Sequence, residues 1–223
     1  MYAMRRDVVN VDSVEDPVEN VIPMVRHHPV NEGLGVTYAM LLRGILRHDP
    51  DVIMVGEIRD SETAEITIRA AETGHHVFTS LHTNSAPETI SRFIEQLPVT
   101  SRDMGKGSIA KTIRAVINQR LIRKLCECAV PMRVIDLEAS HRRSMLEIGM
   151  TDKETIMTPG SCPKCNGVGY RGRVAVIDAV FVPNNSMLRE KMQTVIFEQS
   201  GISRMLSLDG IRHFKRKDWN FEG

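Results

Sequence analysis

Glu57 is the first side chain in this sequence whose position suggests chemistry, because it directly follows the apolar run DVIMVG at residues 51–56. A carboxylate that a buried strand delivers to a turn can orient water for in-line attack on a γ-phosphate, or reach a bound Mg²⁺ through its hydration shell. The same glutamate could instead cap the helix that follows or pair with Arg59. Its position alone leaves these roles open.

Two further groups of polar residues follow other apolar stretches. The turn VEDPVE contains Glu15, Asp16 and Glu19, which could contact a metal or water, or could form a solvated acidic turn. His82, in TSLHTN, could hydrogen-bond to a phosphate, although a single histidine at a strand end is more often a satisfied polar residue. The histidines at residues 75–76 are open to the same two interpretations.

Four cysteines form two short pairs: Cys126 and Cys128, then Cys162 and Cys165. Thiolates from two such knuckles can close a tetrahedral zinc site, and CPKCNGVG has the usual two-residue gap followed by glycines. Only Glu127 separates the first pair, one residue fewer than is usual. We favour a structural four-cysteine zinc site, since a closed tetrahedron leaves no position for substrate. A site that includes His141, a partly vacant site and inert thiols are the alternatives.

The composition excludes several classes of protein. A charged fraction of 26%, a net charge of +1 and 4% aromatic residues do not indicate a surface or stacking platform for nucleic acid. The first 20 residues lack the apolar core of a signal peptide, and no long uncharged apolar run could span a bilayer. We therefore expect a cytosolic protein without membrane insertion, in which paired cysteines favour a metal over disulfides. Its 223 residues suit one domain, or one with a smaller module.

Apolar periodicity and caps predict the elements that position these residues. Strands are expected over residues 8–14, 51–56 and 76–81. Helices are expected over 38–48 (with Thr37 as its N-cap), 61–73 (closed by Gly74) and 87–96. This alternation of strands and helices predicts an α/β protein with a wound parallel sheet, whose ligands lie beyond the carboxyl ends of the strands. Glu57 and His82 follow two such ends.

The second half of the chain is expected to contain more helix. A stripe at helical spacing, from Ile109 to Leu121, predicts a helix over residues 108–125 whose basic residues form a solvated face. A polar helix is expected over 136–148 and a strand over 173–182. Helical segments should follow, ending in the basic stretch IRHFKRKDW at residues 211–219.

Four blocks, from about Val8 to Val182, carry a resemblance to a known family. They are VEDPVE, the stretch from LRGILRHDPDVIMVGEIRD to ETISRF, NQRLIRKLC, and CPKCNGVGYRGR. In order and spacing they closely resemble the secretion ATPase superfamily that powers type IV pili and type II secretion. The resemblance implies a partial RecA-like P-loop ATPase core over residues 1–125, a mainly helical zinc-binding module with a strand over 126–183, and a helical segment over 184–223.

The resemblance also implies roles for individual residues. Glu57 is similar to the Walker B glutamate that positions the attacking water. The other matched positions are Glu15 and Asp16 on the Asp box, His75 and His82 on the His box, and Arg43, Arg47 and Arg59 in supporting positions. ATP and Mg²⁺ are implied cofactors, and the four-cysteine Zn²⁺ site resembles the assembly and secretion branch more than the retraction branch. Implied partners are further copies in a hexamer at the cytoplasmic face of the inner membrane, and an inner-membrane platform protein that moves pilin.

The phosphate-binding loop itself does not occur. No run of the form G-x-x-x-x-G-K-[ST] exists in the 223 residues, and we expect Lys106 in MGKGS to lie in a loop. In the family this loop precedes the acidic box, so we expect a C-terminal portion of such an ATPase that hydrolyses ATP negligibly by itself. The alternative is a non-catalytic adaptor that binds motor subunits through ring surfaces and the zinc module. A zinc-ribbon nucleic-acid binder would need a more basic surface.

Overall fold

The computed structural model describes residues 7–197 and 212–214. Residues 119–177 form one compact unit, and the other described residues form a second, larger unit. The sequence-based prediction divides the chain after residues 125 and 183. Two long strands, β5 (Ala115–Leu125) and β8 (Tyr170–Phe181), each run from one unit into the other.

The larger unit contains a four-stranded sheet in the order β2-β1-β3-β4. Its strands are β1 (Val11–Glu15), β2 (Arg26–Pro29), β3 (Val52–Val55) and β4 (His76–Thr79). Every neighbouring pair is parallel, which confirms the predicted α/β class with a parallel sheet. All five residues of β1 are buried, as expected for a central strand of a parallel sheet.

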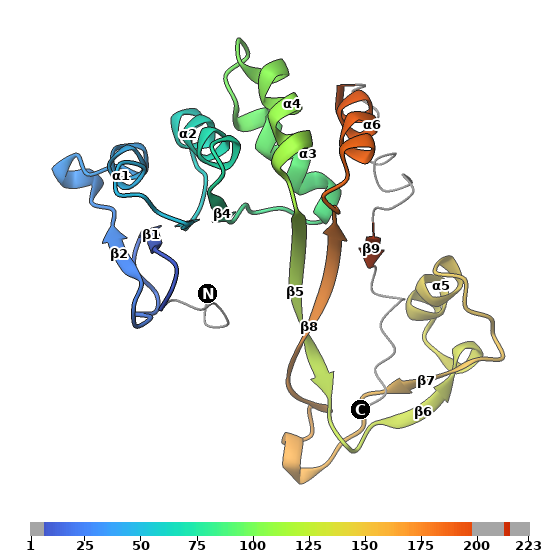
Figure 1. The fold of residues 1–223 in the computed structure, drawn as a ribbon. Helices are drawn as coiled ribbons and strands as arrows, with labels where there is room; N and C mark the ends of the chain where they lie inside the picture. The colour runs from blue at the N-terminus through green and yellow to red at the C-terminus, as the bar shows by residue number, and fades with distance from the viewer. Residues whose placement is uncertain (1–6, 198–211, 215–223) are drawn as a thin grey trace. The chain divides into compact units, whose positions relative to one another are not determined.

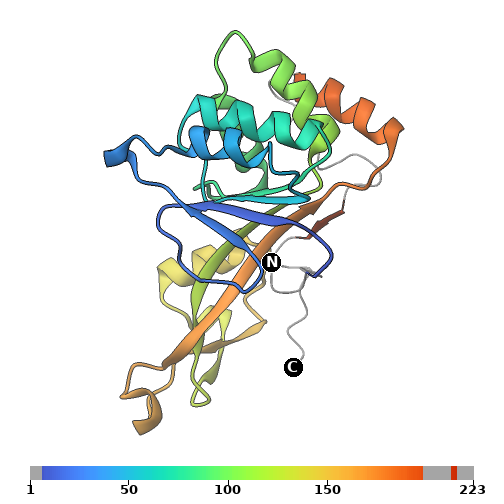
Figure 2. The ribbon, with the colours of Figure 1, turned by 60° about the vertical axis from the view of Figure 1, so that its left-hand side comes forward.

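Helices cover this sheet and supply the core. They are α1 (Tyr38–Ile45), α2 (Ser61–Glu72), α3 (Ala86–Gln96), α4 (Arg102–Thr112) and α6 (Ser186–Phe197). Figure 2 shows α1 and α2 side by side over one face of the sheet. The predicted caps are confirmed: Thr37 accepts the Met40 N–H, and Gly74 follows α2 with a φ of 101°. Fully buried Leu42, Ile45 and Ile53 form part of one continuous core.

The helix expected over residues 108–125 is wrong. Helix α4 ends at Thr112, and β5 begins at Ala115 (Figure 1). At the start of β5, Val116 is buried whereas Ile117 is 60% exposed, which is the alternation of a strand. Tertiary pairing accounts for the difference, because β5 joins β8 in a sheet of order β5-β8-β9. The apolar stripe fits helical spacing, but its β-branched residues are equally suited to a sheet.

Lys106 lies inside helix α4 and not in a loop, which corrects a second prediction. Its ammonium group pairs with Asp103 at 2.9 Å, three residues earlier on the same helix. Gly105, beside it, is buried, and an added Cβ there would lie 2.2 Å from the Cδ1 atom of Leu97. The glycines that resembled a phosphate-loop fragment therefore allow close helix packing.

The smaller unit contains more strand than expected. Within residues 119–177 it holds most of β5 and β8, the antiparallel pair β6 (Val130–Arg133) and β7 (Thr155–Thr158), and helix α5 (Ala139–Glu147). Helix α5 confirms the predicted polar helix, but the expectation of a mainly helical module is wrong. At the C-terminal end, α6 is helical as expected, whereas Arg212–Phe214 form strand β9 antiparallel to β8. The rest of the basic stretch lies outside the described residues.

Arg189 joins α6 to the end of α4. Its side chain is buried, and its two terminal nitrogens donate hydrogen bonds to the carbonyl oxygens of Ala110 (3.0 Å), Lys111 (2.6 Å) and Ile113 (3.0 Å). The last carbonyls of a helix have no partner within the helix and carry partial negative charge, so a cation stabilises them. Burial lowers the pKa of Arg189, and the neighbouring Arg114 lowers it further.

Replacing Arg189 by leucine should lower the free energy of unfolding by about 2–4 kcal/mol, because several buried carbonyls lose their donor. Urea unfolding followed by circular dichroism measures this as a lower midpoint with an unchanged slope. Lys191→Ala, at an exposed position of the same helix, is the matched control and should change stability by less than about 0.5 kcal/mol. Equal midpoints for the two variants would contradict this role of Arg189.

Candidate functional site

Polar side chains gather at the carboxyl edge of the parallel sheet. Asp16 follows β1, Glu57 follows β3 and His82 follows β4. The guanidinium of Arg59 contacts Glu57 Oε1 with one nitrogen and lies 3.3 Å from Asp16 Oδ2 with the other. His82 Nε2 lies 3.5 Å from Glu57 Oε2. We call Asp16, Glu57, Arg59 and His82 the edge cluster.

The backbone beneath Glu57 is held from both neighbouring strands. The N–H of Gly56 donates to Val14 O (2.8 Å), and the hydroxyl of Ser80 donates to Gly56 O (2.6 Å). A Cβ at position 56 would lie 3.1 Å from Val14 O and 3.3 Å from the hydroxyl oxygen of Tyr38. Glycine is therefore suited to this position, where it lets β1 and α1 approach the start of the Glu57 loop closely.

The edge cluster combines two carboxylates with one charged guanidinium. Only 18% of the Glu57 side chain is exposed, whereas that of His82 is 93% exposed. Burial raises the pKa of Tyr38, and the negative charges of Asp16 and Glu57 raise it further, so this phenol stays neutral beneath the cluster. Hydrogen bonding to Glu57 raises the pKa of Arg59, which stays charged. Two carboxylates at one strand edge can approach a metal ion or orient a water molecule.

Glu15 faces a different set of partners. It is 7% exposed, and its Oε1 accepts a hydrogen bond from the Ser13 hydroxyl (2.6 Å). The Ile22 N–H donates to His27 Nε2 (3.0 Å), so the proton of this neutral ring is on Nδ1. That Nδ1 lies 3.0 Å from Glu15 Oε1 and 2.8 Å from Ser13 Oγ. Glu15 thereby connects β1 to β2 and to the loop between them.

Sequence reasoning missed the polar residues of β2. His27 contacts Glu15, and Arg26 and His28 both contact the fully buried Asp12, at 2.7 and 2.8 Å. In the register of this parallel pair, Asp12 lies opposite Arg26 and Ser13 lies opposite His27. The side chains of β1 and β2 are therefore close enough for these contacts. The run RHHP gave little sign of this, because a strand with no apolar alternation resembles a loop.

Removing the His27 ring should destabilise the larger unit. In His27→Ala the Ile22 N–H loses its acceptor and Glu15 loses a donor, so we expect a loss of about 1–3 kcal/mol in the free energy of unfolding. Urea titration measures the loss, with His48→Ala, an exposed histidine after α1, as the matched control. If the two variants unfold at the same urea concentration, His27 does not hold Glu15 in place.

Besides Glu15, three of the predicted residues do not join the edge cluster. His75 precedes β4, and its Nδ1 lies 2.9 Å from the carbonyl oxygen of Ala70, at the end of α2. The register pairs His76 with Val52, the first residue of β3, so His75 is at the amino edge of the sheet. Arg43 pairs with Glu62 between α1 and α2, and Arg47 is exposed beyond the end of α1.

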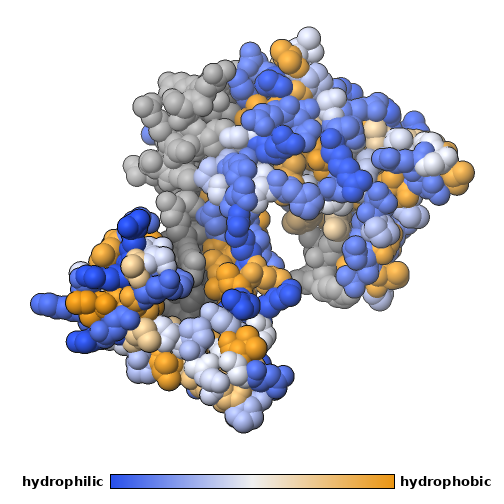
Figure 3. Space-filling model, turned by 180° about the vertical axis from the view of Figure 1, so that it is seen from behind, coloured by the Kyte–Doolittle hydropathy of each residue, from blue (hydrophilic) through white to orange (hydrophobic). Residues whose placement is uncertain are grey.

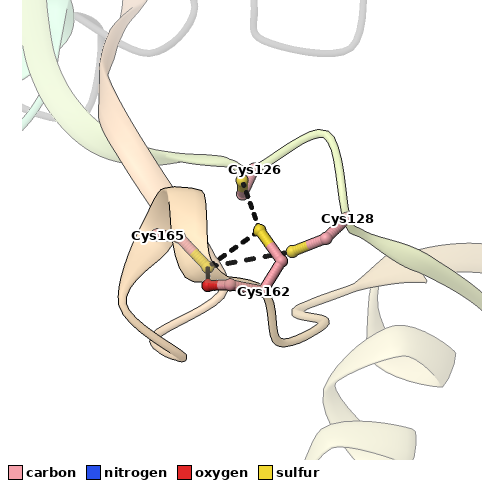
Figure 4. A group of neighbouring side chains, drawn as sticks. All are labelled: Cys126, Cys128, Cys162 and Cys165. Carbon is pink, nitrogen blue, oxygen red and sulfur yellow. Dashed lines mark hydrogen bonds between the residues drawn. The ribbon is translucent and has the colours of Figure 1, made fainter.

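The four cysteines come together in the smaller unit (Figure 4). Their sulfur atoms all lie within 4.8 Å of one another, and three of the distances are 3.8, 3.8 and 3.7 Å. Zinc–sulfur bonds of about 2.3 Å in a regular tetrahedron give edges of about 3.8 Å, so the cluster has the dimensions of a four-thiolate zinc site. His141 instead lies in α5, 3.6 Å from Glu138, and is not part of this group.

Glycines and backbone contacts shape the cluster despite the short first knuckle. A Cβ on Gly160 would lie 1.8 Å from Cys128 O, so only glycine allows this approach. The N–H of Gly169 donates to Cys165 Sγ (3.2 Å), and the Cys126 N–H donates to Gly169 O (2.9 Å). Across the two knuckles, Lys164 pairs with Glu127 at 2.8 Å.

The thiols differ in acidity. Burial, with the neighbouring Cys162 and Cys126 thiols, raises the pKa of Cys128 to about 12. Burial also raises the pKa of Cys165, but hydrogen bonds to its sulfur, above all from the Gly169 N–H, outweigh this effect and lower it to about 6. A cation among the four sulfurs would stabilise their thiolate forms, and in this respect the residues suit a bound metal.

A parallel sheet with acidic and histidine side chains at its carboxyl edge is the arrangement of an α/β protein in which ligands bind beyond the ends of the strands. Residues 2–214 match the family described as Type II/IV secretion system protein, and the chain belongs to this family. The resemblance found in the sequence is therefore confirmed.

Curated relatives include ATPases. The chain is 44% identical over 180 residues to the type IV pilus assembly ATPase PilB of Acinetobacter baylyi, covering 77% of this chain and 28% of that protein. It is 37% identical over 203 residues to the type II secretion system protein E of Dickeya dadantii, covering 88% of this chain and 37% of that protein. The chain thus spans less than two fifths of the length of these relatives.

Solved structures agree on the fold. The pilus retraction motor PilT with bound ADP is 29% identical and matches with a TM-score of 0.56, covering 89% of this chain and 45% of that chain. The ATPase DotB of Legionella pneumophila, at 22% identity and a TM-score of 0.58, covers 93% and 47% and shares the fold. Among the described residues, no helix has the length and apolar character needed to cross a membrane. Figure 3 shows one face of the molecule, on which apolar and hydrophilic residues are intermixed.

Proposed function

We propose that this chain is part of a motor ATPase for type IV pilus assembly or type II secretion. Such a motor would couple ATP hydrolysis to movement of pilin or pseudopilin through an inner-membrane platform protein, working as a hexamer at the cytoplasmic face of the inner membrane. The observation that carries the proposal is the position of Glu57, at the carboxyl end of β3 and in contact with Arg59 and His82. The curated relatives named as ATPases support it.

Within this proposal the edge cluster acts directly on the nucleotide. Glu57 would orient the attacking water, Asp16 would reach Mg²⁺ through its water shell, and His82 would hydrogen-bond to the terminal phosphate. Arg59 holds Asp16 and Glu57 together through its two contacts. For Glu15, His75, Arg43 and Arg47 we propose supporting roles. The first three contact the strands and helices around the cluster.

The cysteine cluster would hold a structural zinc ion. Four thiolates complete a tetrahedron, so the ion would supply folding free energy to the smaller unit and no site for substrate. Cys126, Cys128, Cys162 and Cys165 would be its ligands.

The 223 residues contain no G-x-x-x-x-G-K-[ST] run, so ATP turnover requires this loop from outside them. The test is to purify the chain and add a second polypeptide: the part of the Acinetobacter baylyi relative outside the matched region. We expect phosphate release from ATP only with both present. Binding of the two polypeptides without any phosphate release would favour the non-catalytic adaptor. Steady ATP turnover by the chain alone would contradict the proposal that turnover requires a loop from outside these residues.

A further inference from the structure

The side chain of His82 is held only weakly by its own contacts. It is 93% exposed, and its contact with Glu57 spans 3.5 Å. Hydrogen bonds between charged groups are usually about 2.7–2.9 Å long, and exposed pairs contribute little. Such a contact does not by itself fix an imidazole ring against solvent. The place of His82 therefore depends on the backbone around it. We call residues 80–85, between β4 and α3, the His82 loop.

The first part of the His82 loop is fixed to the backbone around Glu57. The Ser80 hydroxyl donates to Gly56 O (2.6 Å), and the Ser80 carbonyl accepts from the Ile58 N–H (3.3 Å). Gly56 and Ile58 are the two residues that flank Glu57 in the chain. The loop therefore begins at a defined position relative to Glu57.

The part of the loop directly after His82 is fixed by Asn118. The side-chain amide of Asn118 donates to the carbonyl oxygen of Thr83 at 2.9 Å. Asn118 lies on β5, two residues after the buried Val116, so strand alternation directs both side chains to the same face. Only two residues separate the anchored Ser80 from the anchored Thr83, and His82 is one of them.

Asp178, on β8, fixes the end of the His82 loop. Its Oδ2 accepts the N–H of Ala86, the first residue of α3, at 3.0 Å. The first N–H groups of a helix have no partner within the helix and carry partial positive charge, so a carboxylate stabilises them. Asn118, Asp178 and the loop all belong to the larger unit, where the connection from β4 to α3 passes the ends of β5 and β8 (Figure 1).

We propose that Asn118 is a positioning residue for His82. It holds the Thr83 carbonyl, and so keeps the imidazole within reach of Glu57 and of the terminal phosphate. The inference rests on the proposed function, in which His82 contacts that phosphate. Displacement of a group at the reacting centre by about 1 Å can slow a reaction about 10²-fold, so one anchor of a short loop is enough to affect the rate. Asp178 supports the same loop from its helical end.

A purely structural role of Asn118 predicts a different outcome. As a structural anchor alone, Asn118 would stabilise the larger unit, and its loss would slow turnover whether or not His82 is present. A positioning role acts through His82, so its effect must disappear once the imidazole is removed. Two residues that act through one another in this way are non-additive when both are replaced.

Phosphate release separates the two roles, measured on the chain together with the part of the Acinetobacter baylyi relative outside the matched region. Asn118→Leu removes the amide, keeps a similar size and adds no charge. We expect Asn118→Leu to slow turnover at least about tenfold, His82→Ala to slow it at least as much, and the double variant to be no slower than His82→Ala. An equal loss from Asn118→Leu with and without His82 would overturn the proposal.

Gln119→Leu is the matched control for Asn118→Leu. It makes the same chemical change at the next residue of β5, whose side chain is exposed. Turnover by this variant should equal that of the unaltered chain. A loss as large as that of Asn118→Leu would show that any such change in β5 slows turnover, and would overturn the specific role of Asn118.

The ring signals of His82 give a second readout that needs no nucleotide. In the unaltered chain, Glu57→Gln should shift the His82 imidazole resonances in NMR spectra, because the two side chains are in contact. In chains that carry Asn118→Leu, the same Glu57→Gln substitution should leave these resonances unchanged. A response of equal size in the two backgrounds would overturn the proposal. Circular dichroism checks that each variant folds. If Asn118→Leu does not fold, Asn118→Ala, which removes the amide without adding bulk, replaces it in both measurements.

Failure of this inference is distinguishable from failure of the proposed function. If the two polypeptides release no phosphate, the proposed function fails, and the His82 ring signals decide whether Asn118 positions the imidazole. If phosphate is released and Asn118→Leu slows its release equally with and without His82, the proposed function stands and the positioning role fails.

Discussion

Glu57→Gln is expected to slow ATP hydrolysis about 10²–10⁴-fold when the chain is combined with a second polypeptide that supplies the phosphate-binding loop. This is the usual contribution of a positioned acid or base. Glutamine has nearly the shape of glutamate, and it can keep a hydrogen bond to Arg59. It cannot accept a proton from water or attract a metal-bound water as a carboxylate does. The loss should therefore appear in kcat, with little change in KM, because the substitution removes an interaction made in the transition state.

The matched control for Glu57→Gln is Glu95→Gln. Glu95 is exposed on α3, where it pairs with Arg92 at 3.6 Å, and it carries the same charge outside the edge cluster. Phosphate release measured at several ATP concentrations should be unchanged in this control. Equal kcat values for Glu57→Gln and the unaltered chain would remove Glu57 from the catalytic step and leave it as a partner of Arg59.

Cys165→Ser is expected to abolish stoichiometric zinc binding and to unfold the smaller unit. Structural zinc sites contribute apparent binding free energies of about 10–16 kcal/mol at neutral pH, more than a unit of this size gains from its core. Metal analysis of the unaltered chain should give about one zinc per chain, and chelation should melt β6, β7 and α5 while the parallel sheet persists. Circular dichroism reports the total loss of secondary structure, and amide exchange reports the two units separately.

Lys164→Gln serves as the control for the cysteine substitution. It removes the exposed pair with Glu127 beside the cluster but no sulfur ligand, so zinc content should stay at about one per chain. Cys128→Ser tests the short knuckle in the same assay. If chains lacking Cys128 or Cys165 bound as much zinc as the unaltered chain and melted at the same temperature, the structural zinc assignment would be wrong.

Local signals predicted most of the elements of the larger unit. Thr37 and Gly74 marked helix boundaries that the structure confirms, because capping depends on a few neighbouring residues. The uninterrupted apolar run before Glu57 indicated a buried strand of a parallel sheet for a similar reason. The helix predicted over residues 108–125 failed where β5 pairs with β8, since a distant partner strand leaves no signal in the local pattern.

The sequence predicted the types of residue in the candidate site but not which of the candidate residues come together. Glu57, Asp16, Arg59 and His82 come together because parallel strands end at one edge, a rule that applies once the strands are known. His75 belongs to the same sequence block as His82. The four residues of β4 lie between them, however, so His75 is at the opposite edge of the sheet. Glu15 adjoins Asp16, but alternation along β1 directs it towards His27.

The sequence by itself determined the family, the parallel α/β sheet, the two close pairs of cysteines and the absence of a phosphate-binding loop from these residues. Each of these depends on residue types and on spacing along the chain. Only the tertiary structure decided that the four sulfurs lie within 4.8 Å of one another, that Arg189 closes the end of α4, and that His27 contacts Glu15. Such features arise between residues far apart in the chain, where burial and strand register select the contacts.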